Sequence, residues 1–227
     1  MSKTVIPYTI PYTCQFASRD RVREFVAERR LLLSDGLWAD YGADSPNEYA
    51  HWSLRSCGVV CVKMVIEGLG GERRSVMDYV HEGLAIEGYL TTIRDDRPDQ
   101  IVEIGWKHSA LAQLIRNAGY DARLIAEIGL DDICAHLEAG GILIGSVTSQ
   151  LGEVGVEPTR QSGHLVVVVG FSLDESEEVE SVIIHNPSGR TRRLQESAPI
   201  PVERFMAGFS GRGIVIEKPS ALNENPS

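Results

Sequence analysis

The chain has 227 residues, of which 43% are hydrophobic and 24% are charged, and this composition excludes disordered, collagen-like and coiled-coil proteins. Its formal charge of −10 argues against nucleic acid or an anionic membrane surface as the main partner. A chain of this length buries roughly 70–75% of its unfolded surface, so a core can form without a disulfide or a metal ion.

Neither a membrane span nor a secretory leader is predicted. The longest apolar stretch, residues 165–169, is far shorter than the roughly 20 residues that cross a membrane. Residues 1–7 lack the apolar core of a leader, which predicts a cytoplasmic protein whose cysteines are thiols. The cysteines have no zinc-site spacing, so no metal is predicted; they are Cys14, Cys57, Cys61 and Cys134.

Helical patterns dominate the first part of the chain. Residues 5–13 predict an extended or edge strand, and residues 19–33 carry apolar side chains near helical spacing. Residues 45–48 read Ser-Pro-Asn-Glu, a capping box that predicts the start of a short helix. Residues 56–69 predict a helix that is apolar nearly all round and therefore belongs in the centre of the protein. Further helices are predicted at residues 75–84, 109–117 and 130–138.

The pattern changes to that of strands after residue 141. Because the helices precede the strands, their order predicts an α+β fold with an antiparallel sheet rather than alternating β-α-β units. We expect one domain over residues 1–217, followed by a flexible polar tail at residues 218–227. Runs rich in Val and Ile predict strands at residues 142–148, 163–171, 179–185 and 213–217, with a short helix at residues 201–205.

Motifs of several large enzyme classes are missing. The sequence has no dinucleotide-binding fingerprint, no phosphate-binding loop and no zinc-protease HExxH. Residues 208–212 come near the serine-hydrolase GxSxG, but Arg212 takes the place of the last glycine. We therefore predict no nucleotide, flavin or metal cofactor.

A cysteine, a histidine and an asparagine stand at the ends of predicted elements. Cys57 begins the apolar helix, where the helix dipole and unpaired N–H groups favour a thiolate, and Gly58 leaves room for a substrate backbone. His164 begins one strand and Asn186 follows the next, so an antiparallel hairpin would make these two residues neighbours. An amide oxygen beside an imidazole fixes its tautomer, as the third member of a catalytic triad must.

Each of these residues also has a purely structural explanation. A cysteine at a helix start is commonly a small buried residue, a histidine before a strand is commonly a hydrogen-bonded group, and Asn-Pro is a turn signal. Taken together and in this order, the three residues favour a catalytic site over three separate structural roles.

Several segments resemble the papain-like peptidases of family thirty-nine, the bacteriocin-processing, double-glycine leader peptidases and their stand-alone relatives. The similar segments are the nucleophile helix at residues 56–65, a middle helix at 105–120, a histidine strand at 162–171 and an acid or amide corner at 184–189. With the closing residues 205–216, the resemblance covers roughly residues 10–217. The double-glycine preference belongs to relatives fused to transporters and is not carried over to this chain.

The resemblance implies a role for each residue of the triad. Cys57 is the nucleophile, His164 is the general base, and Asn186 orients His164. Residues beside these three are candidates for substrate binding: Gly58, Trp52, His51 and Gly163.

The family also uses a glutamine that donates a hydrogen bond to the oxyanion, usually six residues before the cysteine. This chain has His51 at that position, so Gln15 is the other candidate, with the backbone N–H of Cys57 as second donor. We prefer Gln15 because an amide donor needs no particular protonation state, although an edge-strand surface position would explain it equally well. Choosing Gln15 implies a helical insertion at about residues 18–55.

The sequence therefore predicts a cysteine peptidase or amidase that cleaves a peptide or small amide through an acyl-thioester on Cys57. An amine in place of water would make the same site an acyltransferase or a peptide-tailoring enzyme. A non-catalytic peptide-binding module is the third hypothesis, and its only support is His51 at the expected glutamine position.

Overall fold

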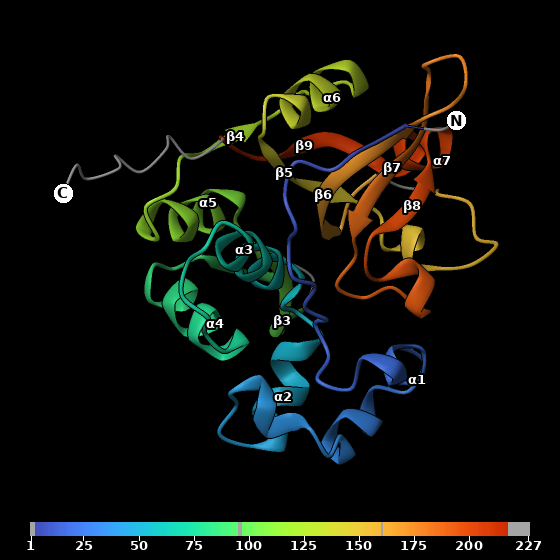
Figure 1. Ribbon diagram of the computed structural model, residues 1–227. Helices are drawn as coiled ribbons and strands as arrows, with labels where there is room; N and C mark the ends of the chain where they lie inside the picture. The colour runs from blue at the N-terminus through green and yellow to red at the C-terminus, as the bar shows by residue number, and fades with distance from the viewer. Residues whose placement is uncertain (1–2, 95–96, 160, 218–227) are drawn as a thin grey trace.

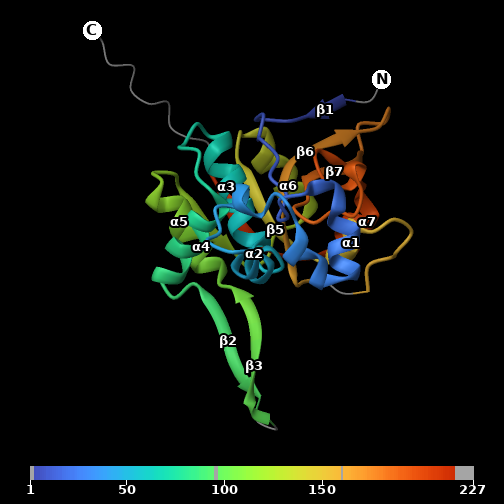
Figure 2. The ribbon, with the colours of Figure 1, turned by 90° about the horizontal axis from the view of Figure 1, so that it is seen from below.

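The computed structural model describes residues 3–94, 97–159 and 161–217, apart from the side chains at 93–101 (Figure 1). The predicted tail, residues 218–227, lies outside the described residues. An antiparallel sheet with helices on both faces forms the body, and a long two-stranded arm projects from it (Figure 2). The predicted α+β fold with an antiparallel sheet is confirmed.

Six strands of the main sheet follow the order β4-β9-β5-β6-β7-β8, and β1 pairs with the far end of β6. Every neighbouring pair is antiparallel. The strands are β1 (Lys3–Val5), β4 (Ala122–Ile125), β5 (Ile142–Val147), β6 (His164–Leu173), β7 (Val179–His185), β8 (Ala198–Pro201) and β9 (Phe209–Ile216).

The two faces of the sheet border two different cores, because side chains alternate along a strand. On β6, Leu165 and Val167 face the core that contains α3 (Cys57–Gly68). Val166 and Val168 face the opposite core, which is covered by α6 (Leu130–Glu138) and α7 (Val202–Gly208). Both faces of the sheet are therefore buried, which explains why the predicted strands consist of nearly continuous runs of Val and Ile.

Helix α3 lies at the centre of one face and packs on β6 (Figure 1). From Gly58 to Ile66 every residue except Lys63 is buried, so the prediction of a helix that is apolar nearly all round is confirmed. Helices α4, α5 and α6 also lie within one residue of their predicted bounds. Among the described helices, none has both the length and the apolar character that a membrane crossing requires. The remaining helices are α1 (Val22–Ala27), α2 (Pro46–Ser53), α4 (Val76–Ala85) and α5 (His108–Asn117).

The helix predicted over residues 19–33 is broken, and that prediction is wrong in its length. Glu28, with φ −136°, interrupts the helix. A continuous helix would place Arg29 and Arg30 one turn below the apolar pair Phe25 and Val26, whereas the break leaves both arginines exposed. The segment consists of short 3-10 helices at Arg19–Arg21, Arg29–Ser34 and Trp38–Tyr41, with α1 after the first of them.

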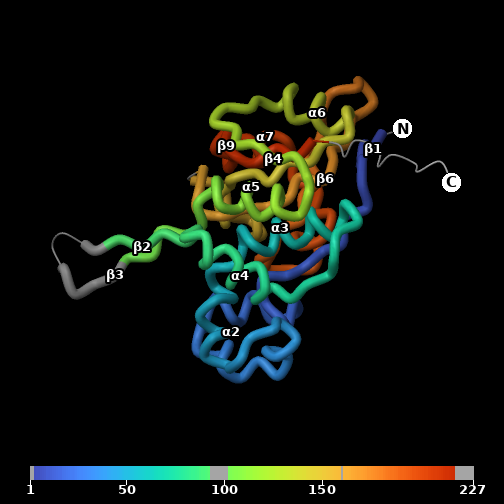
Figure 3. The backbone as a smooth tube through the Cα atoms, turned by 90° about the vertical axis from the view of Figure 1, so that its left-hand side faces the viewer, coloured from blue at the N-terminus to red at the C-terminus, as the bar shows by residue number. Residues whose placement is uncertain are grey.

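The arm is a hairpin of β2 (Tyr89–Arg94) and β3 (Arg97–Trp106), and no strand was predicted there. The charged residues at 94–97 interrupt an alternating pattern of Thr, Ile and Val, which hid the strands from the sequence analysis. The short strands β4 and β8 were missed as well. Figure 3 shows the arm leaving the body at one side, with α2 below its root and the sheet above.

Candidate active site

Cys57 is the first residue of α3, and its side chain is half-buried. The preceding Ser56 occupies the N-cap position but makes no side-chain cap, because its hydroxyl accepts a hydrogen bond from Tyr41. The N–H groups of the first turn are therefore not bound by a capping side chain and remain directed toward the region around the sulfur.

The sulfur of Cys57 lies against the backbone of β6 as well as its own helix. Hydrogen bonds from the N–H groups of Leu165, Gly58 and Cys57 lower the pKa of the thiol, but burial outweighs them and holds the pKa above its ordinary value. The N–H groups at the start of the helix thus favour the thiolate as expected, but their effect is smaller than that of burial. The hydrogen bond from the Leu165 N–H places the sulfur of Cys57 next to the peptide bond between His164 and Leu165.

His164 and Asn186 meet as the hairpin geometry predicted. His164 begins β6 opposite Val147, and Asn186 directly follows β7, the other neighbour of β6. The imidazole Nε2 lies 2.8 Å from Asn186 Oδ1, and both side chains are buried. The structure therefore brings these two predicted site residues into direct contact.

A backbone contact fixes the orientation of the Asn186 amide. The N–H of Ser188 donates to Asn186 Oδ1 over 3.1 Å, and a backbone N–H can only donate. The same oxygen must then accept from His164, so Nε2 carries the imidazole proton. The second ring nitrogen, Nδ1, is left unprotonated and able to accept a proton.

Burial also keeps the imidazole neutral. Desolvation lowers the pKa of His164 to about 4, the positive charge of Arg190 acts in the same direction, and the hydrogen bond to Asn186 opposes both. Arg190 is half-buried and donates to the carbonyl of Ser188. No local sequence pattern indicates this contact, because it depends on how the loop after β7 folds back.

Cys57 and His164 share the wall of a cavity of about 660 Å³. The root of the arm, the start of α5, the sheet and residues between 29 and 55 supply the other walls. The lining residues are Arg29, Leu54, Arg55, Cys57, Tyr89, Glu103, Ile104, Gly105, Trp106, His108, Ser146, Ser162, Gly163, His164, Leu165 and Arg212.

Gln15 lies between the end of α2 and residues 184–189, which we call the asparagine corner. Its side-chain Nε2 donates to the carbonyl of Ser53 over 3.0 Å, and its backbone N–H donates to the carbonyl of Pro187 over 2.9 Å. The side chain is 6% exposed, and Oε1 has no hydrogen-bond partner among the described residues. Gln15 is thus an interior residue near the site and not an edge-strand surface residue, although it is not among the residues that line the cavity.

His51 and Trp52 lie on the outer side of the cavity wall. His51 is exposed and faces Glu103 at 3.8 Å. Trp52 packs against Tyr89 and Trp106, with ring centroids 5.3 and 5.9 Å away, and only these two partners line the cavity. A substrate contact by His51 or Trp52 stays a prediction. Tyr89 and Trp106 are the aromatic rings that reach the cavity, and the missed hairpin is the reason that Tyr89 was not identified.

The two glycines predicted to contact substrate differ from each other. Gly163 lines the cavity and has φ +100°, a conformation that favours glycine directly before His164. At Gly58, a Cβ would lie 2.8 Å from the side chain of Leu111 and 3.2 Å from that of Leu165. The open side of Gly58 therefore faces the core, so we assign this glycine to helix packing and not, as the sequence analysis did, to substrate binding.

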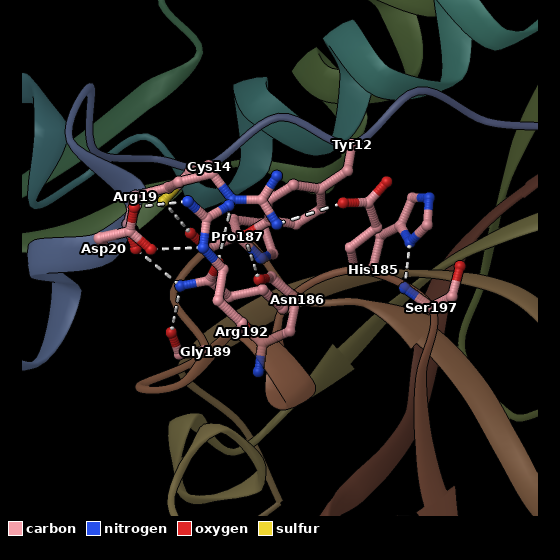
Figure 4. A network of polar contacts seen from close by, with 12 residues as sticks. Tyr12, Cys14, Arg19, Asp20, His185, Asn186, Pro187, Gly189, Arg192 and Ser197 are labelled. Atoms are coloured by element: carbon pink, nitrogen blue, oxygen red, sulfur yellow. Dashed lines mark hydrogen bonds and ion pairs between the residues drawn. The ribbon is translucent and has the colours of Figure 1, made fainter.

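An extended segment at residues 10–15 holds the asparagine corner from the side opposite the sheet (Figure 4). The Tyr12 hydroxyl donates to the carbonyl of Asn186 over 2.9 Å, and the Cys14 thiol donates to that of Pro187 over 3.2 Å. His185 Nε2 lies 2.8 Å from the carbonyl of Ile10, and its Nδ1 accepts from Ser197 N–H. Cys14 is buried, and burial raises the pKa of its thiol to about 11.

Ser188 also contacts the imidazole and was not singled out in the sequence analysis, although it lies within the corner at residues 184–189. Its hydroxyl lies 3.2 Å from His164 Nε2, the nitrogen that also contacts Asn186. We expect Ser188→Ala to lower kcat by roughly three- to tenfold with little change in KM, the loss of about one hydrogen bond. The pH profile should also move, and Ser188→Thr should restore both.

The control for this prediction is Ser172→Ala. Ser172 lies farther along β6, and its half-buried hydroxyl is paired with that of Ser181 on β7. Kinetics on a cleaved peptide and a nitrogen NMR titration of the His164 ring measure the effect. An unchanged kcat and an unchanged ring titration in Ser188→Ala would show that the hydroxyl does not position the imidazole.

No group of three or more His, Cys, Asp or Glu side chains among residues 3–94, 97–159 and 161–217 is arranged to hold a metal ion. The acidic residues at 174–178 form the connection between β6 and β7, and residues 179–180 begin β7.

A helix that begins at a cysteine, packed on an antiparallel sheet that carries a histidine and an asparagine, defines the α+β fold of papain-like cysteine peptidases. Among solved structures, the chain is similar to a C39-like peptidase from Bacillus anthracis, with 16% identity and a TM-score of 0.57 over 96% of this chain and 99% of that chain. The resemblance to family thirty-nine is confirmed at the level of the fold.

Two further solved structures are similar to parts of the chain. One is a double glycine motif protease from an AMS/PCAT transporter in complex with its leader peptide, with 16% identity and a TM-score of 0.43 over 72% of this chain and 84% of that chain. The other is the peptidase domain of Streptococcus ComA, with 14% identity and a TM-score of 0.47 over 73% of this chain and 93% of that chain. No family model and no curated protein sequence matches the chain.

Proposed function

We propose that the protein is a cysteine peptidase or amidase in which Cys57 is the nucleophile, His164 the general base and Asn186 the residue that orients the imidazole. One observation carries the proposal. The amide oxygen of Asn186 holds the Nε2–H of His164 at 2.8 Å, which leaves Nδ1 as the proton acceptor at the wall of a cavity shared with Cys57. The fold shared with a C39-like peptidase supports it.

The reaction follows from these positions. His164 Nδ1 takes the proton of the thiol as the sulfur bonds to the carbonyl carbon, and the carbonyl electron pair moves to the oxygen. The tetrahedral intermediate collapses to a thioester, and the leaving amine takes the proton from Nδ1. Water then attacks the thioester with the same base, which releases the carboxylic acid and restores the thiol.

The oxyanion is stabilised by donors at the start of α3. The backbone N–H of Cys57 is the first donor, because the first turn has no side-chain cap. Gln15 Nε2 is the second donor, since one of its two hydrogens is bound to the carbonyl of Ser53 and the other remains for the substrate. Because Gln15 is buried and does not line the cavity, this role requires its side chain to move toward the bound carbonyl.

The resting site is a neutral pair of thiol and imidazole. Burial raises the pKa of Cys57 and lowers the pKa of His164 to about 4, so both groups are uncharged near neutral pH. A substrate carbonyl that accepts the developing negative charge is what makes proton transfer favourable. This arrangement limits the reaction of the thiol with oxidants when no substrate is bound.

The pH dependence tests this mechanism. Activity measured as kcat/KM should fall as the pH drops through about 4, because an imidazolium cannot accept the thiol proton. Asn186→Asp places a carboxylate at Nε2 and raises the pKa of His164, so the acid limb should move to higher pH by about one unit or more. Nitrogen NMR of the His164 ring measures the same shift without a substrate.

Asn47→Asp is the matched control, because it adds the same charge at an exposed position in the first turn of α2. It should leave the acid limb and the ring titration near those of the unaltered protein. An acid limb that does not move in Asn186→Asp, or that moves equally in Asn47→Asp, would show that His164 is not the general base.

A further inference from the structure

The cavity carries positive charge in a chain whose formal charge is −10. Three arginines and a single acidic residue are found among the described residues that line it: Arg29, Arg55, Arg212 and Glu103. Arg55 and Glu103 neutralise each other in an ion pair. The remaining two arginines border the cavity, are exposed and have no ion-pair partner among the described residues, so their charges are not neutralised by a neighbouring carboxylate.

Arg212 is placed at the cavity by a bulge in β9. Gly145 pairs with Gly213 and Val147 pairs with Phe209, so β9 has extra residues opposite Ser146 of β5. The hydroxyl of Ser210 donates to the carbonyl of Ser146 over 3.0 Å and holds the bulge against β5. Bulges next to active sites redirect side chains in this way.

The sheet order sets the separation between Arg212 and the site. In the order β9-β5-β6, Ser146 pairs with Leu165, the residue after His164. Two strand spacings thus lie between the bulge and the backbone of the histidine, roughly 10 Å. An extended peptide advances about 3.3–3.6 Å per residue, so this distance corresponds to about three residues of substrate.

A second observation places the charge of Arg212 near another residue of the cavity wall. His108, the first residue of α5, lines the same cavity, and its pKa is lowered by burial and by the positive charge of Arg212. Glu127 passes beside the bulge at Gly211 but forms no ion pair with Arg212 in the described part of the chain. The guanidinium is therefore available to a ligand on the cavity side.

We propose that the cavity selects substrates by a carboxylate that pairs with Arg212, within about three residues of the bond that Cys57 attacks. The carboxylate belongs either to an acidic side chain or to the free C-terminus of the substrate. Arg29, on the helical insertion, adds to the attraction from another wall. This proposal rests on the proposed function, because the ligand is a substrate only if the protein cleaves it. The binding of a carboxylate can nevertheless be measured without turnover.

The test compares two alkylating reagents of nearly equal size, iodoacetate and iodoacetamide, at Cys57. Both reagents react with the same sulfur, so the ratio of their rates reports the electrostatic attraction of the carboxylate and not the reactivity of the thiol. We expect Arg212→Gln to lower this ratio roughly two- to tenfold at low salt and Arg212→Lys to preserve most of it. Mass spectrometry of the peptide that contains Cys57 measures the rates at this cysteine alone.

Arg23→Gln is the matched control, since it removes the same charge from an exposed position on α1 that does not line the cavity. Its ratio should stay at the value of the unaltered protein. The difference between Arg212→Gln and the unaltered protein should shrink at high salt, because screening weakens attraction over this distance. Equal ratios for Arg212→Gln and the unaltered protein at low salt would overturn the proposal.

A peptide library then separates the two sources of the carboxylate. In a proteome-derived library, cleavage sites should be enriched in Asp or Glu within three positions of the cut, or should lie within three residues of a free C-terminus. Amidation of the C-termini abolishes the second preference and leaves the first. Cleavage without either preference would refute the carboxylate proposal while upholding the peptidase, whereas a normal iodoacetate preference without any cleavage would refute the peptidase alone.

Discussion

Replacing Cys57 by alanine should abolish peptide cleavage and leave the fold intact. Among the described residues that line the cavity, Cys57 is the only one with a thiol, and losses on removing such a nucleophile are on the order of 10⁴-fold or more in kcat. The side chain is half-buried, so its truncation should cost little stability. New peptide termini in a proteome-derived library, detected by mass spectrometry, measure the cleavage.

Cys134→Ala is the matched control, because Cys134 is also half-buried but lies on α6, beneath the other face of the sheet. This variant should cleave the library as the unaltered protein does. Cleavage that persists in Cys57→Ala would show that Cys57 is not the nucleophile. A chain that binds peptides equally well with and without the sulfur and cleaves none of them would be a peptide-binding module.

Replacing Gln15 by alanine should lower kcat by about 10²–10³-fold, the typical loss of one oxyanion donor. The same substitution at His51 should change kcat far less, because His51 is exposed and faces Glu103 outside the cavity lining. This pair of variants therefore decides which residue takes the place of the glutamine that usually precedes the cysteine.

Alkylation of Cys57 by iodoacetamide separates catalysis from structure in this comparison. The alkylation passes through no oxyanion, so Gln15→Ala should leave its rate nearly unchanged if Gln15 acts on the substrate. A purely structural Gln15, which supports Ser53 one turn before the nucleophile, would alter alkylation and cleavage together. A large loss in His51→Ala with normal activity in Gln15→Ala would reverse the assignment.

The central contacts of the site could be predicted from sequence because they follow from local rules. A strand that begins with His164 and a neighbouring antiparallel strand that ends before Asn186 must place the two side chains together. A helix without a polar face must be central, and its first residue, Cys57, then lies at the edge of the core. These inferences need only the period of each element and the direction of the hairpin.

The remaining features depend on contacts between distant segments, which no local pattern encodes. The burial of Arg190 and Cys14 results from loops that fold over the asparagine corner. The role of Gly58 depends on Leu111 of another helix. The arm was missed because charged residues interrupt its alternation, so the aromatic ring of Tyr89 could not be assigned to the cavity.

The strap formed by residues 10–15 has a consequence for the order in which the molecule matures. The bonds from Tyr12 and Cys14 to the asparagine corner join positions 174 and 173 residues apart, and contacts of such long range form late and slowly. Most of the polypeptide must therefore be synthesised before these two bonds can hold the residues that follow β7. We expect the nascent chain to show no peptide cleavage until the strap has docked.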